Sequence, residues 1–200
     1  MGRAKTYDRD VVTERAMLLF WERGYHATST RDLTDAMGVN PYSLYAEFGS
    51  KEALYAAAID HYEATVFQGH FGALEASGAS IEEIRAVLDF FGDMGIHDVD
   101  RRGCLLCNAT TELAPSAAQS QLLASRFVRR LNGAFGNALG NARAAGRLMD
   151  GTSVDSLAAL FPSVLLGIFV MARGGVDGVV LRAAADQALA QLEAVVRVGA

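Results

Sequence analysis

The stretch from Thr28 to Lys51, TSTRDLTDAMGVNPYSLYAEFGSK, decides the fold. Ser29, with Asp32 three residues later, forms a variant of the capping box that begins a helix. Gly38 can end that helix in a left-handed conformation. Asn40, followed by a proline, is a good N-cap for a second short helix. The stretch therefore predicts two short helices joined by a tight turn, which is the pattern of the helix-turn-helix motif.

The second of these helices has an inward and an outward face. Leu44 and Phe48 lie one turn apart and are expected to pack inward. In a helix-turn-helix motif the second helix enters the major groove of DNA, which is about 12 Å wide. Hydroxyl groups there can bind phosphates, and aromatic rings can contact thymine methyl groups. The residues expected to face outward are Pro41, Tyr42, Ser43 and Tyr45.

The rest of the chain shows the periodicity of helices throughout. Apolar residues from Val12 to Phe20 share one helical face, and Gly24 ends that helix. Further helices are expected from Lys51 past Tyr62 towards Phe71, from Ser80 to about Met94, from Cys104 to Leu113, from Pro115 to about Arg147, from Ser153 to Arg173 and from Gly178 to Val196. Residues 95–103 read as a polar connection. We expect an all-α fold of about nine helices, with an N-terminal DNA-binding domain over residues 1–51 and a helical effector-binding and dimerisation domain over 52–200.

Composition places the chain among globular proteins. It has 200 residues, of which 51% are hydrophobic and 20% charged, enough for a sizeable core. The first ten residues are polar and do not resemble a secretory signal. Two cysteines can form at most one disulfide, too few to stabilise a chain of this length, so we expect a cytoplasmic protein. The longest apolar run, Ser156 to Ala172, is shorter than the ~18–20 residues of a membrane span and contains Pro162. We therefore expect a buried core helix and no membrane segment.

The charge of the predicted DNA-binding domain is balanced. Residues 1–51 contain seven Lys or Arg and seven Asp or Glu, so the rest of the chain carries the net charge of −5. Arg3 and Lys5 either add phosphate contacts or belong to a solubilising tail. Glu47 adds a negative charge to the second helix of the motif. Because the domain lacks a basic patch, we expect only a moderate salt dependence of DNA binding.

The stretch from Ala16 to Leu33, AMLLFWERGYHATSTRDL, together with Gly38-Val39, Leu44-Tyr45, Phe48 and Lys51-Glu52, resembles the TetR family of bacterial transcriptional regulators. The resemblance covers about residues 7–55. It implies a homodimer that binds palindromic operator DNA, usually as a repressor, and a small molecule that releases the DNA. It also implies that Thr28 and Lys51 hold phosphates. The candidate DNA-binding residues are Thr28, Ser29, Asn40, Pro41, Tyr42, Ser43, Tyr45 and Lys51. Tyr42 stands where many family members have Gly, which predicts an unusual base readout.

The second informative stretch is residues 101–115, RRGCLLCNATTELAP. It resembles a Gly-Cys-Leu-Leu-x-Asn segment of one subgroup of that family. Cys104 and Cys107 stand at an expected helix N-terminus, where the helix dipole and the neighbouring Arg101 and Arg102 favour a lowered thiol pKa. Two interpretations remain open: a redox or electrophile sensor, or two small buried hydrophobes. No histidine has ligand spacing with this Cys-x-x-Cys pair, so we expect no metal site.

A conventional effector needs an apolar pocket with a few polar groups. The candidate ligand-binding residues are Phe67, Phe71, Phe90, Phe91, Met94, Cys107, Asn108, Thr111, Phe127, Phe161 and Phe169. As a group they suit a hydrophobic or aromatic molecule. The last two expected helices are apolar over so wide an arc that they need cover on two sides. A second copy of the chain, forming a four-helix interface, or plain burial within a monomer can supply that cover. We expect the homodimer.

Two other classes of protein compete with this interpretation. The sequence contains no Walker A loop, no Gly-x-Gly-x-x-Gly after a strand, no Gly-x-Ser-x-Gly and no His-Glu-x-x-His. We therefore expect neither an enzyme nor a cofactor. A helical ligand-binding protein without specific DNA binding accounts for the C-terminal helices, but it leaves the stretch from Thr28 to Lys51 unexplained.

Overall fold

The computed structural model describes residues 7–97, 101–112 and 118–197, and over these residues the fold is helical apart from one isolated bridge between Leu148 and Val196. The elements are α1 (Arg9–Arg23), α2 (Thr30–Met37), α3 (Pro41–Phe48), α4 (Lys51–Tyr62), η1 (Glu63–Phe67), α5 (Gln68–Glu75), α6 (Ile81–His97), α7 (Leu105–Glu112), α8 (Ala118–Ala144), α9 (Val154–Arg173) and α10 (Gly178–Glu193). The predicted all-α fold class is confirmed.

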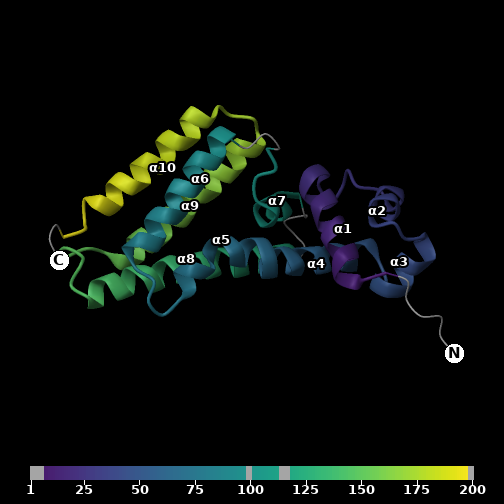
Figure 1. Cartoon of the computed structure of the whole chain (residues 1–200), viewed down its shortest axis with the longest axis horizontal. Coiled ribbons are helices and arrows are strands. Elements are labelled where there is room, and N and C mark those ends of the chain that lie inside the picture. Colours follow the sequence, from purple (N-terminus) through teal and green to yellow (C-terminus); the bar gives the residue numbers. More distant parts are fainter. Residues whose placement is uncertain (1–6, 98–100, 113–117, 198–200) are drawn as a thin grey trace.

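The first three helices form a bundle at one end of the molecule (Figure 1). Asp8 caps the start of α1, since its side chain accepts a hydrogen bond from the Asp10 N–H, and the buried face of α1 packs against α4. Ser29 and Asp32 form the predicted capping box of α2, and Gly38 ends α2 with a φ of 70°. The capping signals in the sequence therefore set the bounds of the helix-turn-helix.

One long helical segment leads out of this bundle. It comprises α4, the π-helical turn η1 and α5, and it ends at Glu75, slightly beyond the predicted region around Phe71. In η1 the Gln68 N–H donates to the Glu63 carbonyl five residues earlier, so the segment changes phase without breaking. α8 packs along α5 (Figure 1). The segment from α4 to α5, together with α8, therefore connects the N-terminal bundle to the other helices.

The remaining helices form a second body, in which α10 packs against α6 and α9 packs against α8 and α10 (Figure 1). α6 continues to His97, past the predicted end near Met94, because a glycine such as Gly95 costs a helix interior only about 1 kcal/mol relative to alanine. The predicted helix ends at Leu113 and Pro115 lie outside the described residues. α8 ends at Ala144 and α10 at Glu193, each three residues before the predicted end.

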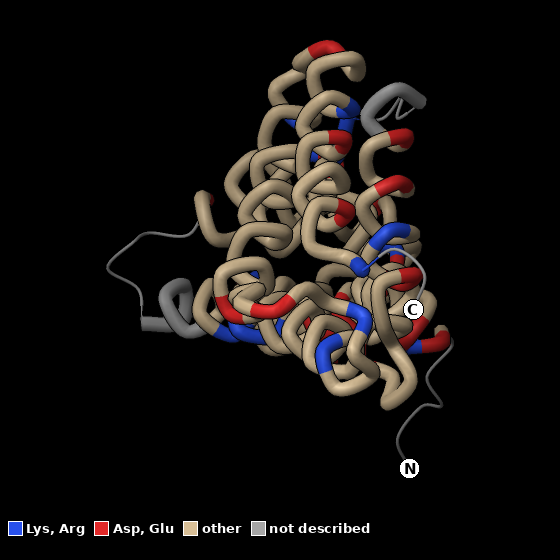
Figure 2. Tube along the Cα trace, turned by 90° about the vertical axis from the view of Figure 1, so that its left-hand side faces the viewer, with Lys and Arg blue, Asp and Glu red and all other residues tan. Residues whose placement is uncertain are grey.

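Charged side chains on this body form ion pairs between helices, and Figure 2 shows acidic and basic positions interspersed along the trace. Arg85 on α6 binds Glu193 on α10, and Arg182 on α10 binds Asp89 and Asp93 on α6. Because these pairs are exposed, each contributes little on its own, and the buried apolar faces hold the helices together.

α9 is apolar on more than its packed face. Within the described residues it is the one helix long and apolar enough to cross a membrane by length and composition alone. Phe161, Leu165 and Ile168 are fully buried, whereas Leu160 and Val170 are exposed on the opposite side. The expected core helix is therefore packed on one face and open on the other.

Candidate nucleic-acid interface and effector core

α3 presents its polar and aromatic residues to solvent, as the helical period predicts. Leu44 and Phe48 are buried against α2 and α4. Tyr42 is 84% exposed and Tyr45 46% exposed. The Tyr45 hydroxyl lies 3.3 Å from the Thr30 hydroxyl at the start of α2, which orients the ring. The outward face of α3 is thus open to a macromolecular groove.

The two ends of the α2–α3 turn are held by side-chain caps. Ser29 caps α2, and the Asn40 side chain accepts from the Ser43 N–H at 2.8 Å, with Pro41 as the first helical residue. Ser29, Asn40 and Pro41 are all exposed, and Ser43 is half-buried. These predicted DNA-binding residues lie on one connected surface at the start of α2 and α3.

Thr28 and Lys51 have defined contacts within the protein. The Thr28 side chain is buried, and its hydroxyl donates to the Gly24 carbonyl at 2.6 Å, so it faces the protein and not the solvent. The Lys51 ammonium lies 4.2 Å from the centre of the Tyr25 ring, at the first turn of α4. Burial and the neighbouring Glu52 raise the pKa of Tyr25 to about 12, which keeps its hydroxyl protonated. Lys51 is therefore positioned by an aromatic ring.

Glu47 does not point along the outward face of α3. Its carboxylate accepts from Arg9 at 3.1 Å and from the Tyr7 hydroxyl at 3.4 Å, and its side chain is largely buried. The negative charge that Glu47 adds to the second helix of the motif is thus paired with a cation of α1.

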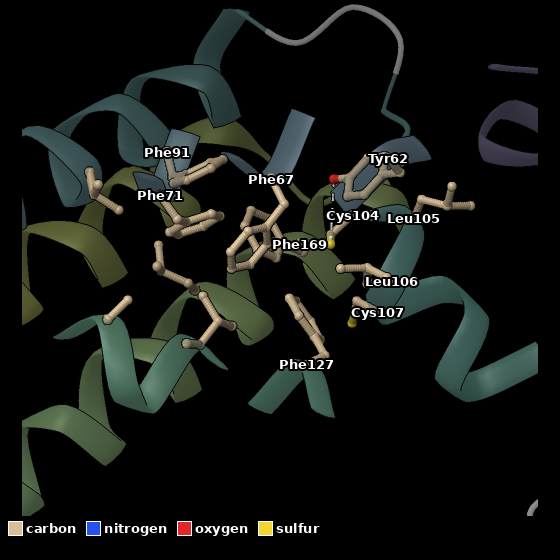
Figure 3. Packing of buried hydrophobic residues seen from close by; sticks show 14 of the residues in the cluster. Tyr62, Phe67, Phe71, Phe91, Cys104, Leu105, Leu106, Cys107, Phe127 and Phe169 are labelled. Carbon is tan, nitrogen blue, oxygen red and sulfur yellow. Dashed lines mark hydrogen bonds between the residues drawn. The ribbon is translucent and has the colours of Figure 1, made fainter. Parts of the chain in front are cut away.

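Five of the eleven predicted effector residues meet in one aromatic core (Figure 3). Phe127, Phe67, Phe71, Phe91 and Phe169 form a continuous series of ring contacts, with centroid distances between 4.7 and 5.9 Å. They come from η1, α5, α6, α8 and α9. Four helices and the π turn therefore share a single aromatic interior.

Several predicted effector residues lie elsewhere. Phe161 pairs with Phe135 in a separate contact between α9 and α8. Phe90 is 46% exposed, because it lies one residue from Phe91 and so on another side of α6, and its ring packs against His70 in a tilted arrangement. Thr111 is exposed, and Met94 is half-buried at the edge of the core.

Asn108, another predicted effector residue, is buried. Its amide donates to the Arg102 carbonyl at 3.0 Å, which ties α7 to the segment before it.

The two cysteines are buried, which reverses the sign of the expected pKa shift. Burial raises the pKa of the Cys104 thiol to about 11, and it raises the pKa of Cys107 as well. Cys104 accepts a hydrogen bond from the Tyr62 hydroxyl at 3.6 Å. The expectation of a lowered pKa was wrong, because loss of water outweighs the helix dipole at this depth. Within the described residues no cluster of His, Cys, Asp or Glu could hold a metal ion.

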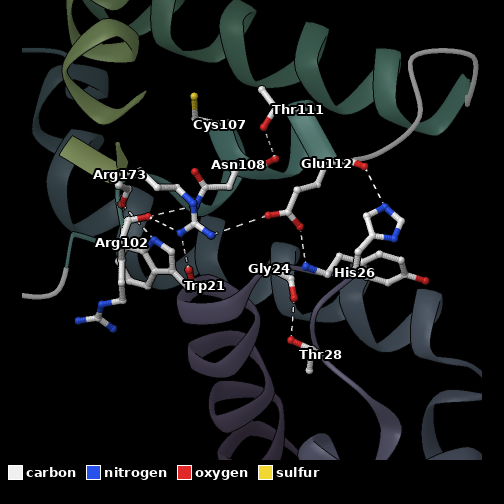
Figure 4. Close-up of polar contacts among 12 residues, drawn as sticks. Trp21, Gly24, His26, Thr28, Arg102, Cys107, Asn108, Thr111, Glu112 and Arg173 are labelled. Carbon is white, nitrogen blue, oxygen red and sulfur yellow. Dashed lines mark hydrogen bonds and ion pairs between the residues drawn. The ribbon is translucent and has the colours of Figure 1, made fainter. Parts of the chain in front are cut away.

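The joint between the N-terminal bundle and the second body was missed by sequence reasoning (Figure 4). The chain's single tryptophan, Trp21, donates its indole N–H to the Gly103 carbonyl at 3.0 Å. Arg173, at the end of α9, donates to the Trp21 carbonyl at 3.0 Å and approaches Glu112 on α7. A lone tryptophan beside the first predicted helix end was the one sequence signal that could have pointed here.

Comparison with known proteins agrees with this geometry. Residues 12–58 match the sequence profile of bacterial regulatory proteins of the TetR family. The chain is 32% identical over 178 residues to the HTH-type transcriptional repressor ComR of Escherichia coli K12, covering 87% of this chain and 83% of that protein. It is 30% identical over 179 residues to the HTH-type transcriptional regulator YezE of Bacillus subtilis, covering 88% and 92%.

A solved structure shows the same arrangement of helices. A cysteine-substituted form of the TetR-family regulator CifR, in complex with a 26-base-pair double-strand operator DNA, matches with a TM-score of 0.82 and 31% identity. The match covers 94% of this chain and 98% of that chain. The fold and the exposed α3 define a helix-turn-helix transcriptional regulator. The chain belongs to the TetR family: it is a DNA-binding regulator of transcription and not an enzyme.

Proposed function

We propose that this chain is a cytoplasmic, homodimeric repressor that a small hydrophobic or aromatic molecule releases from a palindromic operator. The observation that carries the proposal is the outward face of α3, where Tyr42 and Tyr45 are exposed beside capped helix ends. The names of ComR in Escherichia coli and of DhaR in Mycobacterium describe repressors, which favours repression here. Tyr42, Ser43 and Tyr45 contact the major groove, and Lys51 binds a phosphate.

The open faces of α9 and α10 support the dimer. On α9, Leu160, Ser163, Gly167 and Val170 follow one another at spacings of three and four residues, and Val170 is 55% exposed. On α10, the exposed residues Val180, Ala183, Gln187 and Ala190 repeat the same spacing. Such apolar stripes with small residues suit a four-helix contact about a two-fold axis. The dimer sets the distance between two α3 helices at about one DNA turn, ~34–36 Å.

The aromatic core supports an apolar effector. Its rings come from η1, α5, α6, α8 and α9, so a molecule inserted among them has to shift helices that lead to both α3 and the dimer face. A ligand that binds one spacing of the α3 helices better than another lowers DNA affinity by that difference. Sensing through cysteine receives no support from the raised thiol pKa values.

The experiment compares binding of the purified protein to DNA from upstream of its own gene with binding to random DNA at equal salt. A preference of about a thousandfold supports the proposal. Val170→Asp should give a monomer in sedimentation and lose most operator affinity, while Val128→Asp on the exposed side of α8 should leave both unchanged. Dimers of Val170→Asp with full affinity would contradict the proposed interface. Aromatic compounds that raise the melting temperature should also release the DNA.

A further inference from the structure

We infer that Glu112 is the positioning residue that couples the effector core to the DNA-binding bundle. The inference rests on the proposed function and deepens it. Glu112 is the last residue of α7, and its side chain binds the loop between α1 and α2. We use the name Glu112 joint for Gly24, Glu112 and Arg173, which Figure 4 labels, together with Tyr25.

The Glu112 carboxylate is bound by the backbone of the DNA-binding bundle. Its Oε2 accepts a hydrogen bond from the Tyr25 N–H at 2.5 Å. Its own carbonyl oxygen lies 3.0 Å from the His26 imidazole Nε2. A carboxylate at a helix C-terminus faces the negative end of the dipole of α7, so it needs donors from outside that helix. The loop after α1 supplies them.

Gly24 makes the close approach possible. Its φ of 87° lies in the region that favours glycine, and a Cβ at this position would lie 2.5 Å from Glu112 Oε1. The carboxylate thus occupies the space that a side chain would fill. The buried Thr28 hydroxyl binds the Gly24 carbonyl from the other side and fixes the loop.

Arg173 connects the same joint to α9. One guanidinium nitrogen donates to the carbonyls of Trp21 and Arg102 at 3.0 and 3.1 Å, and another lies 3.9 Å from Glu112 Oε1. Arg173 stands in the last turn of α9, and Trp21 in the last turn of α1, where a cation is favoured. The joint therefore brings together α1, α7 and the helix proposed for the dimer.

α7 reaches from the aromatic core to this joint. Leu106 and Cys107 belong to the same buried cluster as Phe127 (Figure 3), and Glu112 lies little more than one turn beyond Cys107 along α7. Beyond Glu112, the ring of Tyr25 lies under the Lys51 ammonium. A displacement of α7 in the core thus moves the backbone that positions Lys51. Within this inference, the arrangement that binds DNA is the one in which the Glu112 carboxylate accepts from the Tyr25 N–H.

The test uses the full-length protein and a duplex that the wild type selects from a random DNA pool. Glu112→Gln keeps the size and an acceptor oxygen but removes the charge, and we expect about tenfold weaker binding of this duplex. Glu83→Gln is the matched control, because Glu83 accepts from the Ser80 N–H at 2.7 Å within the α5–α6 connection. We expect it to change binding by less than about twofold.

Hydrogen exchange of the α7 amides tests whether Glu112 couples α7 to DNA binding or only stabilises the DNA-binding bundle. Saturating duplex should slow exchange of the amides of residues 105–112 about threefold or more in the wild type and in Glu83→Gln, and much less in Glu112→Gln. Equal slowing in Glu112→Gln, or none in the wild type with DNA bound, overturns the inference. Hydrogen exchange of the wild type with and without duplex still tests the inference if Glu112→Gln does not fold. Failure to select any duplex overturns the proposed function, and the inference with it.

Discussion

The Cys104 thiol shows how burial sets the chemistry of a single residue. In the folded protein its pKa is about 11, compared with 9.0 for a free thiol. Between these values an unfolded chain loses a proton that the folded chain keeps. The free energy of unfolding should therefore fall with rising pH above about 9, by about 1.4 kcal/mol per pH unit from this group. Denaturant unfolding at pH 8 to 10.5 measures this slope.

Two variants isolate the contribution of Cys104. Cys104→Ala loses packing at every pH but should show a shallower decline of stability than the wild type. Cys107→Ala retains Cys104 and should keep most of the slope. Tyr25, Tyr55 and Tyr62 also have raised pKa values, so they add to the slope near pH 10, and the three proteins are best compared below that pH. A decline in Cys104→Ala as steep as that of the wild type would contradict the assignment.

At the scale of the helix, replacing a glycine with alanine is predicted to change the free energy of unfolding in opposite directions in α8 and α6. A Cβ on Gly133 in α8 meets no atom within 4 Å outside its own helix backbone. Gly133→Ala should therefore raise the free energy of unfolding by about 0.5–1 kcal/mol, because alanine loses less backbone entropy on folding. A Cβ on Gly92 in α6 would lie 2.8 Å from the Cβ of Ala185 in α10. Gly92→Ala should lower stability, since it forces apart two packed helices.

Urea unfolding of the two variants checks this pair. Both changes replace a helical glycine with alanine, so any difference in sign comes from the surroundings of the methyl group. Destabilisation by Gly133→Ala would mean that α8 packs closely there against something outside this chain.

The elements differ in how far the sequence predicts them. Ser29, Asn40 and Ser50 each cap a helix with a side chain, and such local hydrogen bonds can be read from the sequence. The π turn η1 has no side-chain cap, and its Phe67 packs against the ring of Phe127, a contact between residues far apart in the sequence. Neither can the joint at Glu112 be read from the sequence, since its partner Tyr25 lies 87 residues away.

At the scale of the whole molecule, the balance of charge controls how DNA binding depends on salt. Arg9, Arg23 and Arg31 are paired with carboxylates inside the N-terminal bundle, and Arg15 donates to the Met37 carbonyl at 3.3 Å. Lys51 remains on the α3 side, and Arg3 and Lys5 lie outside the described residues. With one phosphate each for Lys51, Arg3 and Lys5, the largest number these three cations can neutralise in a dimer is six, so log Kd should rise with log salt with a slope of about 5 at most. A slope of about 10 or steeper would contradict this count.

The variant Glu47→Gln tests the predicted number of phosphate neutralisations directly. It removes the carboxylate that holds Arg9 at 3.1 Å, which leaves that guanidinium able to reach a phosphate. Operator binding should tighten at low salt, and the slope should steepen by about 2 for the dimer, one phosphate for each protomer. Glu22→Gln removes the same charge from the last turn of α1, where Glu22 pairs with Arg23 at 3.8 Å. If both variants steepen the slope equally, net charge alone governs it, and the pairing of Arg9 with Glu47 has no part in DNA binding.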